Sequence, residues 1–573
     1  MKLKGLSCVA SLLAIVTLAS CGSQASSTIN PDDIGYQYAD PTKPVVATAN
    51  GISFNIMAPK DPLAKNYADM QIIKNINAQT NVNVNWTHPA SYSLETIMVS
   101  GNLPDAIYHA GFTDPYIIQY GVKRNKIVAI DNYLDKMPYF SKILEKNPEI
   151  RKEITVDGHI YALPRIEEMG LVNRPNLLFI NKDWLGKLID SGDVNFISKS
   201  DLKDGLKLTL AQFKQVLALF QTNKMGAAVD TDEIIPLDMI YNNWQGNISD
   251  LYAAYGAYYQ PDFKTLVNGE VICDLNTDAW RNATVKIHDE FFKTGLIPEK
   301  AFEQTQQQLL ADGKGTEKIG AFYYWEKESV VANQDNYICM EPLVGTDGQR
   351  INLNNNHEVN KGEVVVFSTV ANPDILLTYL DRYYETWNSA QLNYGAIGEA
   401  FEQHVADDPI LRSVTSYKDE NGNTITADDF RLRNAPMGLT GLTDNVWYTG
   451  SEAAPTGETS YGAEIAEEDR QVEMEPRAKT RRNLLDNYES MDYVFPGQEV
   501  IPNIVYTADE IQTLQKYEVN LGNAFSRYTL QYLKDGGLEN DANWNKLQSD
   551  LASLHLPDVL NINNSGYQRL IAD

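Results

Sequence analysis

The chain has 573 residues, 43% of them hydrophobic and 22% charged, which excludes a mainly disordered protein and allows more than one folded body. Its formal net charge of -28 repels phosphate backbones, so nucleic acid is excluded as the expected partner. Four cysteines are too few for a disulfide scaffold, and seven scattered histidines do not suggest a zinc centre.

The N-terminus has the layout of a secretory signal followed by a lipid attachment site. Two lysines precede an apolar stretch that ends at LASC, residues 18–21. This order resembles the bacterial lipobox, whose cysteine is acylated and becomes the first residue of the mature protein. We therefore expect residues 1–20 to be a lipoprotein signal peptide, Cys21 to carry lipid such as palmitate, and residues 21–45 to be a flexible tether. An ordinary secretory signal with an incidental cysteine is the alternative.

The first part of the body alternates predicted strands and helices. Alternating apolar residues predict strands within 45–59 and at 82–86, and helical spacing predicts a helix over 66–81. A second helix passes through Gly101 into a strand at Ala106 to Tyr108. This alternation of strands and helices predicts an open parallel α/β sheet.

A second series of elements follows in the same style. Predicted strands lie at 177–181, 318–325 and 363–369, and predicted helices at 208–222, 277–298 and 373–387. The C-terminal third is predicted to be helical and rich in loops.

Common catalytic signatures are missing from the sequence. There is no Walker phosphate loop, no dinucleotide glycine fingerprint, no zinc-protease motif and no hydrolase nucleophile elbow. We therefore expect a protein that is not an enzyme. The 76 acidic residues keep a surface glycoside hydrolase with paired carboxylates open as an alternative.

Segments with a recognisable pattern follow one another over most of residues 50–400. They are MVSGNLPDAIYHAG (98–111), YGVKRNKIVAIDNYLDKMP (120–138), VDGHIYALPRIEEM (156–169), LLFINKDWLGKL (177–188), TLAQFKQVLALFQ (209–221), KIGAFYYWE (318–326) and VVFSTVANPDILLTYLDRYYE (365–385). In this order they resemble the family 1 extracellular solute-binding proteins of ATP-driven importers, the group that includes maltose-binding protein.

The resemblance implies an α/β, two-lobed periplasmic-binding-protein-like fold of type II, with the ligand cleft between the lobes. Lobe 1 is expected to comprise residues 46–163 and about 363–440, and lobe 2 residues 164–362 and about 441–573. The implied function is capture of an oligosaccharide for the permease subunits of an ABC importer, by a monomer anchored through lipid to the outer face of the bacterial cytoplasmic membrane. A glycan-sensing or adhesion lipoprotein that works without a transporter is a further alternative.

The resemblance also implies that certain polar residues contact the ligand. Tyr108 and His109 end a first-lobe strand at the cleft, although Tyr108 is equally compatible with core packing. Arg165 and Glu167 lie in the crossing between the lobes. There they offer charge-assisted hydrogen bonds to sugar hydroxyls, or form a salt bridge across the cleft.

The resemblance implies further ligand contacts by aromatic side chains of the second lobe. Aromatic residues of one loop are expected to contact the ligand as well. Trp244 stands where relatives present an aromatic, and Trp325 corresponds to a stacking tryptophan at the end of a strand, where a structural role is the alternative. Trp447 and Tyr448 lie in a loop flanked by Gly and Thr, and loops often carry binding residues.

No cofactor is expected. Many anchored relatives have an oxygen-rich, calcium-like loop, but here Gln221 and Met225 stand where oxygen ligands would be needed. The carboxylates Asp230, Asp232 and Glu233 alone do not establish a calcium site.

Overall fold

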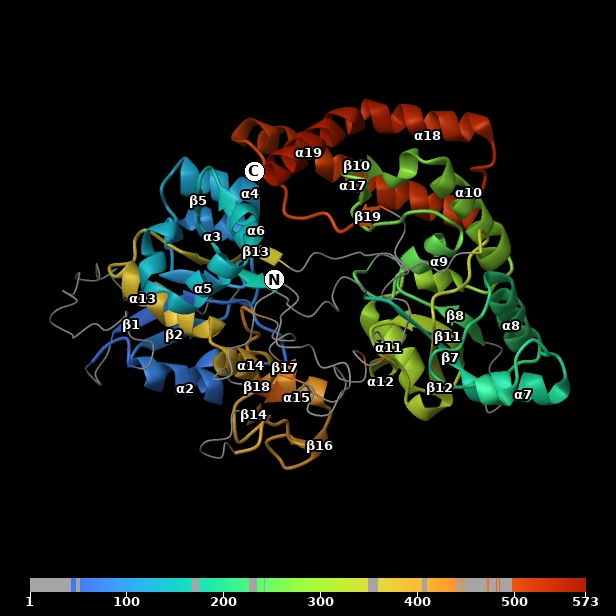
Figure 1. The fold of residues 1–573 in the computed structure, drawn as a ribbon, viewed down its shortest axis with the longest axis horizontal. Helices are drawn as coiled ribbons and strands as arrows, with labels where there is room; N and C mark the ends of the chain where they lie inside the picture. Colours follow the sequence, from blue (N-terminus) through green and yellow to red (C-terminus); the bar gives the residue numbers. More distant parts are fainter. Residues whose placement is uncertain are drawn as a thin grey trace, which may run out of the picture.

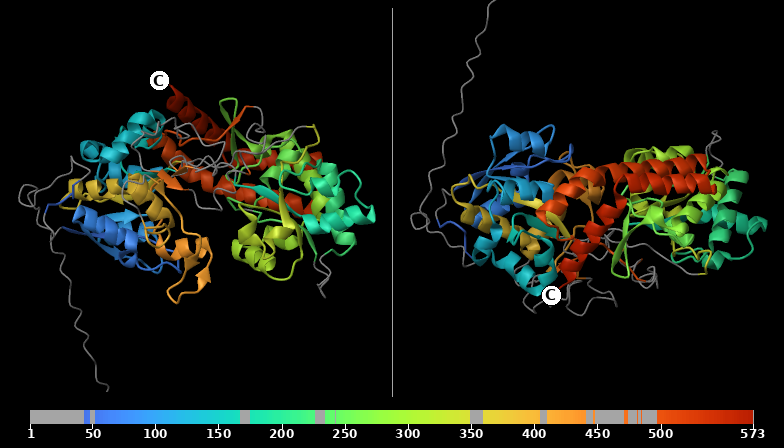
Figure 2. Two further views of the ribbon diagram at one scale, coloured as in Figure 1. Left: turned by 60° about the horizontal axis from the view of Figure 1, so that its bottom comes forward. Right: turned by 90° about the horizontal axis from the view of Figure 1, so that it is seen from above.

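Two α/β bodies lie side by side and are joined along one edge by C-terminal helices (Figures 1 and 2). Each surrounds its own sheet and its own buried core. We name them the β1 body and the β7 body after the first strand of each main sheet. The computed structural model describes residues 43–47, 52–166, 175–225, 234–241, 243–348, 359–403, 410–440, 446–447, 471–473, 481, 484 and 497–572.

The β1 body contains a mixed sheet of strand order β2-β1-β3-β13-β6. The parallel strands are β1 (Ser53–Met57), β2 (Asn83–Thr87) and β3 (Ala106–Tyr108), which confirms the predicted parallel arrangement at the start of the body. The long strand β13 (Val359–Val366) returns from the β7 body and runs antiparallel to both β3 and β6 (Leu163–Ile166).

Helices cover the sheet of the β1 body because their apolar residues repeat at helical spacing. Ile72, Ile73 and Ile76 of α2 are fully buried in its core. The helices of this body and of the segment that follows it are α2 (Gln71–Thr80), α3 (Leu94–Ser100), α4 (Asp114–Tyr116), α5 (Pro138–Lys146), α6 (Pro148–Glu153), α13 (Pro373–Asp381), α14 (Thr386–Tyr394) and α15 (Ala427–Asn434).

The β7 body contains a second sheet, of strand order β12-β7-β11-β8. Its strands are β7 (Leu177–Asn181), β8 (Ile235–Asp238), β11 (Ile319–Tyr324) and β12 (Tyr337–Met340). β7 runs antiparallel to β11 and β12, whereas β8 is parallel to β11. Every residue of these strands is buried, so both faces of the sheet are covered.

The helices of the β7 body anchor a large core. Trp184 and Trp280 are fully buried in it, together with Phe213 of α8, whose first turn has a complete capping box at Thr209. The helices are α7 (Lys182–Ser191), α8 (Leu210–Thr222), α9 (Ser249–Ala254), α10 (Asp278–Ile287), α11 (Gln306–Lys314) and α12 (Lys327–Val330).

The C-terminal helices α17 (Ala508–Asp535), α18 (Asp541–Ser553) and α19 (Leu556–Ile571) form the edge that joins the bodies (Figure 1). Phe525 and other apolar residues of α17 pack in the β7-body core, whereas Ile511 in its first turn packs in a cluster of the β1 body. Across the described part of the chain, no helix combines the length and apolarity needed to cross a bilayer.

The other described strands belong to small sheets. They are β4 (Thr155–Val156), β5 (His159–Ile160), β9 (Lys264–Val267), β10 (Glu270–Cys273), β14 (Ile410–Leu411), β15 (Tyr417–Lys418), β16 (Thr424–Ile425), β17 (Val446–Trp447), β18 (Gln471–Glu473) and β19 (Gln498–Glu499).

Element boundaries differ in places from the sequence predictions. The helix predicted over 277–298 is α-helical only to Ile287 and continues as a π-helical turn to Phe292. β6 ends at Ile166 and β13 begins at Val359, so the first sheet includes a few residues that the prediction placed in lobe 2. The division into lobes stays a prediction.

A buried carboxylate caps a helix of the β1 body from a distance in sequence. Asp381 accepts hydrogen bonds from the backbone N–H groups of Tyr139 (3.2 Å) and Phe140 (2.8 Å) in the first turn of α5. Met137, the N-cap residue of α5, supplies no side-chain acceptor, so Asp381 takes that role. Burial raises the pKa of Asp381 to about 7, although both hydrogen bonds oppose the shift.

This shift predicts a pH-dependent stability. The folded carboxyl binds its proton more tightly than the unfolded one, whose ordinary pKa is 3.8. Its contribution to stability is therefore fully present below the unfolded pKa and is lost as the pH rises through the folded pKa. Because asparagine does not titrate, we expect the melting temperature of Asp381→Asn to improve relative to the parent protein between about pH 5 and about pH 8.

The exposed Asp135 supplies the control. Its Asp135→Asn variant should keep a constant offset from the parent across the same pH range. A constant offset for Asp381→Asn as well would contradict the assignment.

Candidate ligand-binding site

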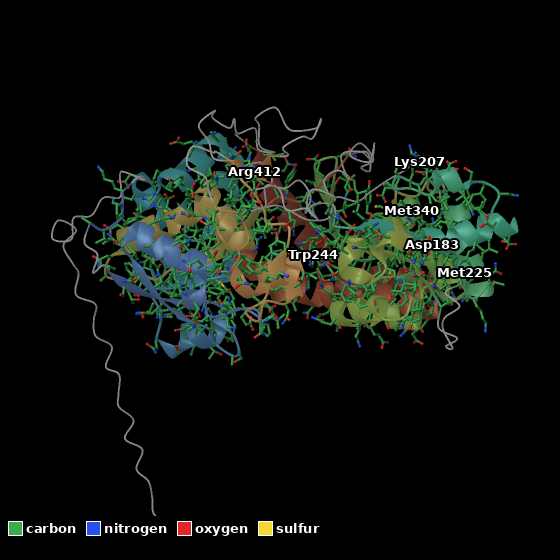
Figure 3. All side chains as sticks on the ribbon, turned by 90° about the horizontal axis from the view of Figure 1, so that it is seen from below. Asp183, Lys207, Met225, Trp244, Met340 and Arg412 are labelled. Carbon is green, nitrogen blue, oxygen red and sulfur yellow. The ribbon has the colours of Figure 1, made fainter. Side chains whose placement is uncertain are left out.

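Trp244 and Trp325 form an aromatic pair at one edge of the β7-body sheet. Trp325 directly follows β11, and Trp244 lies in the loop after β8, the parallel neighbour of β11. Because the carboxyl ends of parallel strands share one edge, these two segments meet there. The ring centroids are 5.4 Å apart, with the planes inclined by 55°. Trp244 is 45% exposed, and in Figure 3 it lies near the middle of the molecule, where the two bodies adjoin in that view.

The loop that carries Trp244 is held by a buried asparagine. Asn176 Oδ1 accepts hydrogen bonds from the backbone N–H groups of Gly246 (2.7 Å) and Asn247 (3.3 Å). Gly246 has a φ of 70°, and a Cβ atom there would lie 2.9 Å from the carbonyl oxygen of Tyr323. Only glycine fits this close approach, which fixes the path of the loop and the position of Trp244.

Arg481 covers part of the Trp325 ring. Its guanidinium carbon lies 3.6 Å from the ring centroid, and its Nη1 atom donates a hydrogen bond to the Trp325 carbonyl oxygen. Arg481 is only 1% exposed, so the cation–π contact is shielded from water, where such contacts are strongest. The pair therefore presents to solvent the ring of Trp244 and the remaining surface of Trp325.

In the β1 body, Tyr108 and His109 leave strand β3 side by side. Tyr108 is fully buried, and its hydroxyl donates a hydrogen bond of 2.5 Å to the carbonyl oxygen of Met437. His109 has a φ of 55°; its Nδ1 atom hydrogen bonds with the carboxylate of Glu363, and its Nε2 atom lies 2.6 Å from the Pro436 carbonyl oxygen. The two side chains thus hold the loop at 436–437 against the sheet.

Arg165 joins this group from strand β6. Its Nη1 atom lies 3.8 Å from the sulfur of Met437, and its charge acts on Glu363. Burial raises the pKa of Glu363, but the hydrogen bond from His109 and the charges of His109 and Arg165 outweigh it, so the net pKa is lowered. Glu363 is therefore an anion at neutral pH, and Asn360 donates a further hydrogen bond to it at 3.1 Å.

The structure therefore brings together Tyr108, His109 and Arg165 in one body, and Trp244 and Trp325 in the other. Of the remaining predicted site residues, Glu167, Tyr448 and Cys21 lie outside the described residues, as does the side chain of Trp447. Their roles stay predictions, as do those of the described ones.

Asn176, Glu363 and Arg481 were missed by the sequence analysis. No local motif marks them, because their partners lie 70, 254 and 156 positions away along the chain.

The described residues contain no group of three or more His, Cys, Asp or Glu side chains placed to hold a metal ion. The carboxylates of the predicted calcium-like loop, Asp230, Asp232 and Glu233, lie outside the described residues.

We compared the chain with known protein families and with known proteins. No protein-family model matches the chain. The fructooligosaccharide ABC transporter substrate-binding protein FusA of Streptococcus pneumoniae serotype 4 is 26% identical over 595 residues, which cover 100% of both chains. The chain is therefore similar over its whole length to the substrate-binding protein of an ABC transporter.

Solved structures share the fold of this chain. S. pneumoniae FusA in complex with kestose matches with a TM-score of 0.74 at 23% identity, covering 90% of this chain and 99% of that one. An HMO-binding, ABC-transporter-associated solute-binding protein from Bifidobacterium longum infantis matches with a TM-score of 0.69 at 20% identity, covering 90% and 98%. The predicted α/β fold of the solute-binding proteins is thereby confirmed.

Proposed function

We propose that this solute-binding protein captures an oligosaccharide between its two bodies and delivers it to the permease subunits of an ABC importer. The observation that carries the proposal is the aromatic pair formed by the exposed Trp244 and the partly buried Trp325. A tryptophan ring offers a flat apolar face to the C–H groups of a sugar ring, while nearby polar groups bind its hydroxyls. The relative named for fructooligosaccharides and its structure with kestose support a sugar as the ligand.

In this proposal the β1 and β7 bodies are the lobes of the sequence prediction, and the ligand lies in a cleft between them. The tryptophan pair provides the apolar platform from the β7 body. Arg165 provides a polar group from the β1 body, together with Glu167 from the adjoining crossing. For His109 we adopt a positioning role, because both of its ring nitrogens are bonded within the β1 body. Trp447 and Tyr448 add aromatic contacts from their loop. For Tyr108 we adopt core packing, because its ring is fully buried and its hydroxyl is bonded to the main chain.

Capture and delivery are linked through closure of the lobes. A ligand that contacts both bodies binds the closed form more tightly than the open form, and so shifts the population toward the closed form. The permease then distinguishes loaded from empty receptors by their shape.

Calorimetric titration with kestose and nystose tests the platform. We expect Trp325→Ala to weaken binding by about tenfold, since an aromatic contact of this kind contributes roughly 1.5 kcal/mol beyond burial. Trp544→Ala provides a matched control. Trp544 lies on α18, where Arg281 of α10 packs against its ring, so its substitution should leave the affinity unchanged.

Two results would contradict the proposal. One is the absence of binding to any oligosaccharide in a panel of different linkages. The other is equal loss of affinity in the Trp325 and Trp544 variants, which would place the ligand elsewhere.

We also propose that lipid on Cys21 anchors the receptor to the outer face of the cytoplasmic membrane, with the residues between Cys21 and the buried Val45 as the tether. Mass spectrometry of the native N-terminus should find a diacylated Cys21, and Cys21→Ser should release the protein from the membrane fraction. An unmodified mature chain that begins at another residue would remove the anchor and leave the binding proposal standing.

A further inference from the structure

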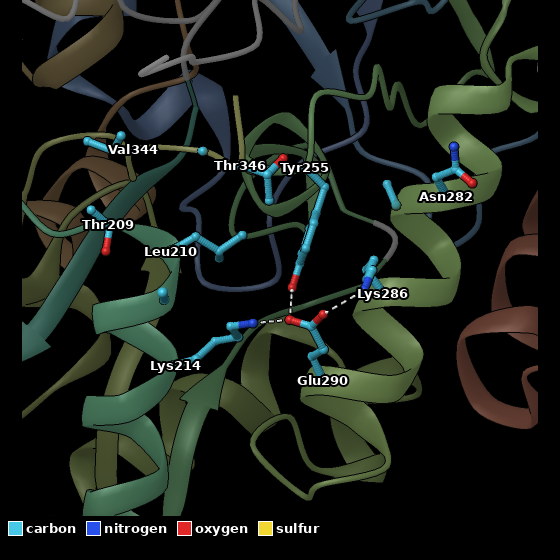
Figure 4. A pocket seen from close by; sticks show the side chains of 12 residues that line it. Thr209, Leu210, Lys214, Tyr255, Asn282, Lys286, Glu290, Val344 and Thr346 are labelled. Atoms are coloured by element: carbon cyan, nitrogen blue, oxygen red, sulfur yellow. Dashed lines mark hydrogen bonds and ion pairs between the residues drawn. The ribbon is translucent and has the colours of Figure 1, made fainter. Parts of the chain in front are cut away.

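The β7 body contains a cavity (Figure 4), and its lining includes neither Trp244 nor Trp325. It lies between the first turns of α8, one face of α10 and the loop at 344–346, and has a volume of about 390 Å³. Small-molecule sites in proteins commonly start near 300 Å³, roughly the size of this cavity.

A shared carboxylate forms the floor of the cavity. Glu290 Oε2 accepts hydrogen bonds from the Tyr255 hydroxyl (2.9 Å) and from Lys214 Nζ, and Lys286 Nζ lies 3.4 Å from Oε1. Figure 4 shows these three groups converging on Glu290 from different elements. Burial raises the pKa of Glu290, but the hydrogen bonds from Lys214 and Tyr255 outweigh it, so the net pKa is lowered.

The floor therefore carries a net positive charge, because two ammonium groups share one carboxylate. Both carboxylate oxygens of Glu290 are already engaged, whereas each ammonium has three N–H donors and only one partner oxygen among the described residues. The unused hydrogen-bonding capacity thus consists mainly of donors, which suit an anionic oxygen of a ligand.

The walls add neutral polar groups and an aromatic ring. The exposed side chains of Asn282 and Thr346 make no hydrogen bond to another residue of the described chain, and both line the cavity. The ring of Tyr255 stands above Glu290 beside Leu210 (Figure 4). An amide, a hydroxyl and a ring face are the groups that bind a sugar unit.

A purely structural role accounts for part of this arrangement. The ion pair between Lys214 and Glu290 ties α8 to the end of α10 and needs no ligand. It does not account for the second lysine, for the open volume above the carboxylate, or for the free side chains of Asn282 and Thr346.

We propose that this cavity is a second carbohydrate site, for a single sugar unit that bears a carboxylate. Lys286 and Lys214 bind the carboxylate, Asn282 and Thr346 bind ring hydroxyls, and Tyr255 contacts the ring. The proposal goes beyond oligosaccharide capture at the tryptophan pair and does not depend on it. Since the chain as a whole carries a net charge of -28, this local positive charge makes the cavity a selective place for an anion.

Titration of the full-length Trp325→Ala protein with D-glucuronate, followed by protein-observed NMR, tests the site without the main platform. Shifts should be saturable and centred on α8, α10 and the loop at 344–346. Lys286 is 59% exposed, so Lys286→Gln should not disturb folding, and we expect it to weaken binding by about fivefold. Asn282→Leu should also weaken binding.

Lys293→Gln is the matched control, because Lys293 is 69% exposed and pairs with Asp289 outside the cavity. It should leave glucuronate binding unchanged. D-glucose has the ring hydroxyls but no carboxylate, and acetate has the carboxylate but no sugar ring. Each should therefore bind more weakly than glucuronate.

Several results would overturn the site. They are the absence of saturable shifts, equal loss of binding in the Lys286 and Lys293 variants, or binding of acetate or glucose that equals that of glucuronate.

Discussion

The β1 body and the β7 body are joined by the packing of α17 against both of them. Ile511, in its first turn, lies in a cluster of the β1 body, whereas Leu514 and most later apolar residues lie in the core of the β7 body. The chain just before α17 is fixed as well, since the side chain of Asn503 donates hydrogen bonds to Glu153 and to the carbonyl oxygen of Val359. The 28-residue helix α17 therefore holds the two bodies together along one edge.

The two bodies carry different kinds of side chain at their candidate site residues. The β7 body buries every residue of its sheet strands and holds its aromatic pair through Asn176, Gly246 and Arg481. The β1 body instead presents a charged group, in which Glu363 is kept anionic beside His109. In the proposed function, apolar groups of one body and polar groups of the other match the two kinds of surface on a sugar ring.

Much of the fold could be predicted because local patterns specify it. Strand β7 has the predicted bounds, and α8 ends at the predicted residue and begins two residues after the predicted start. The candidate site was only partly accessible to sequence reasoning. Trp244 and Trp325 stood out as aromatics near strand ends, but the cation–π contact with Arg481 joins segments 156 residues apart, and the burial of Tyr108 depends on packing with the distant Met437 loop. Such contacts form only when the chain has folded, so no local sequence pattern predicts them.

The most direct test of the account is a crystal structure of the protein grown with kestose. The account predicts an intact trisaccharide between the lobes, with one sugar ring against Trp244 and Trp325 and its hydroxyls bonded to groups of the β1 body. A sugar bound only outside the space between the lobes, or one cleaved into smaller products, would contradict it.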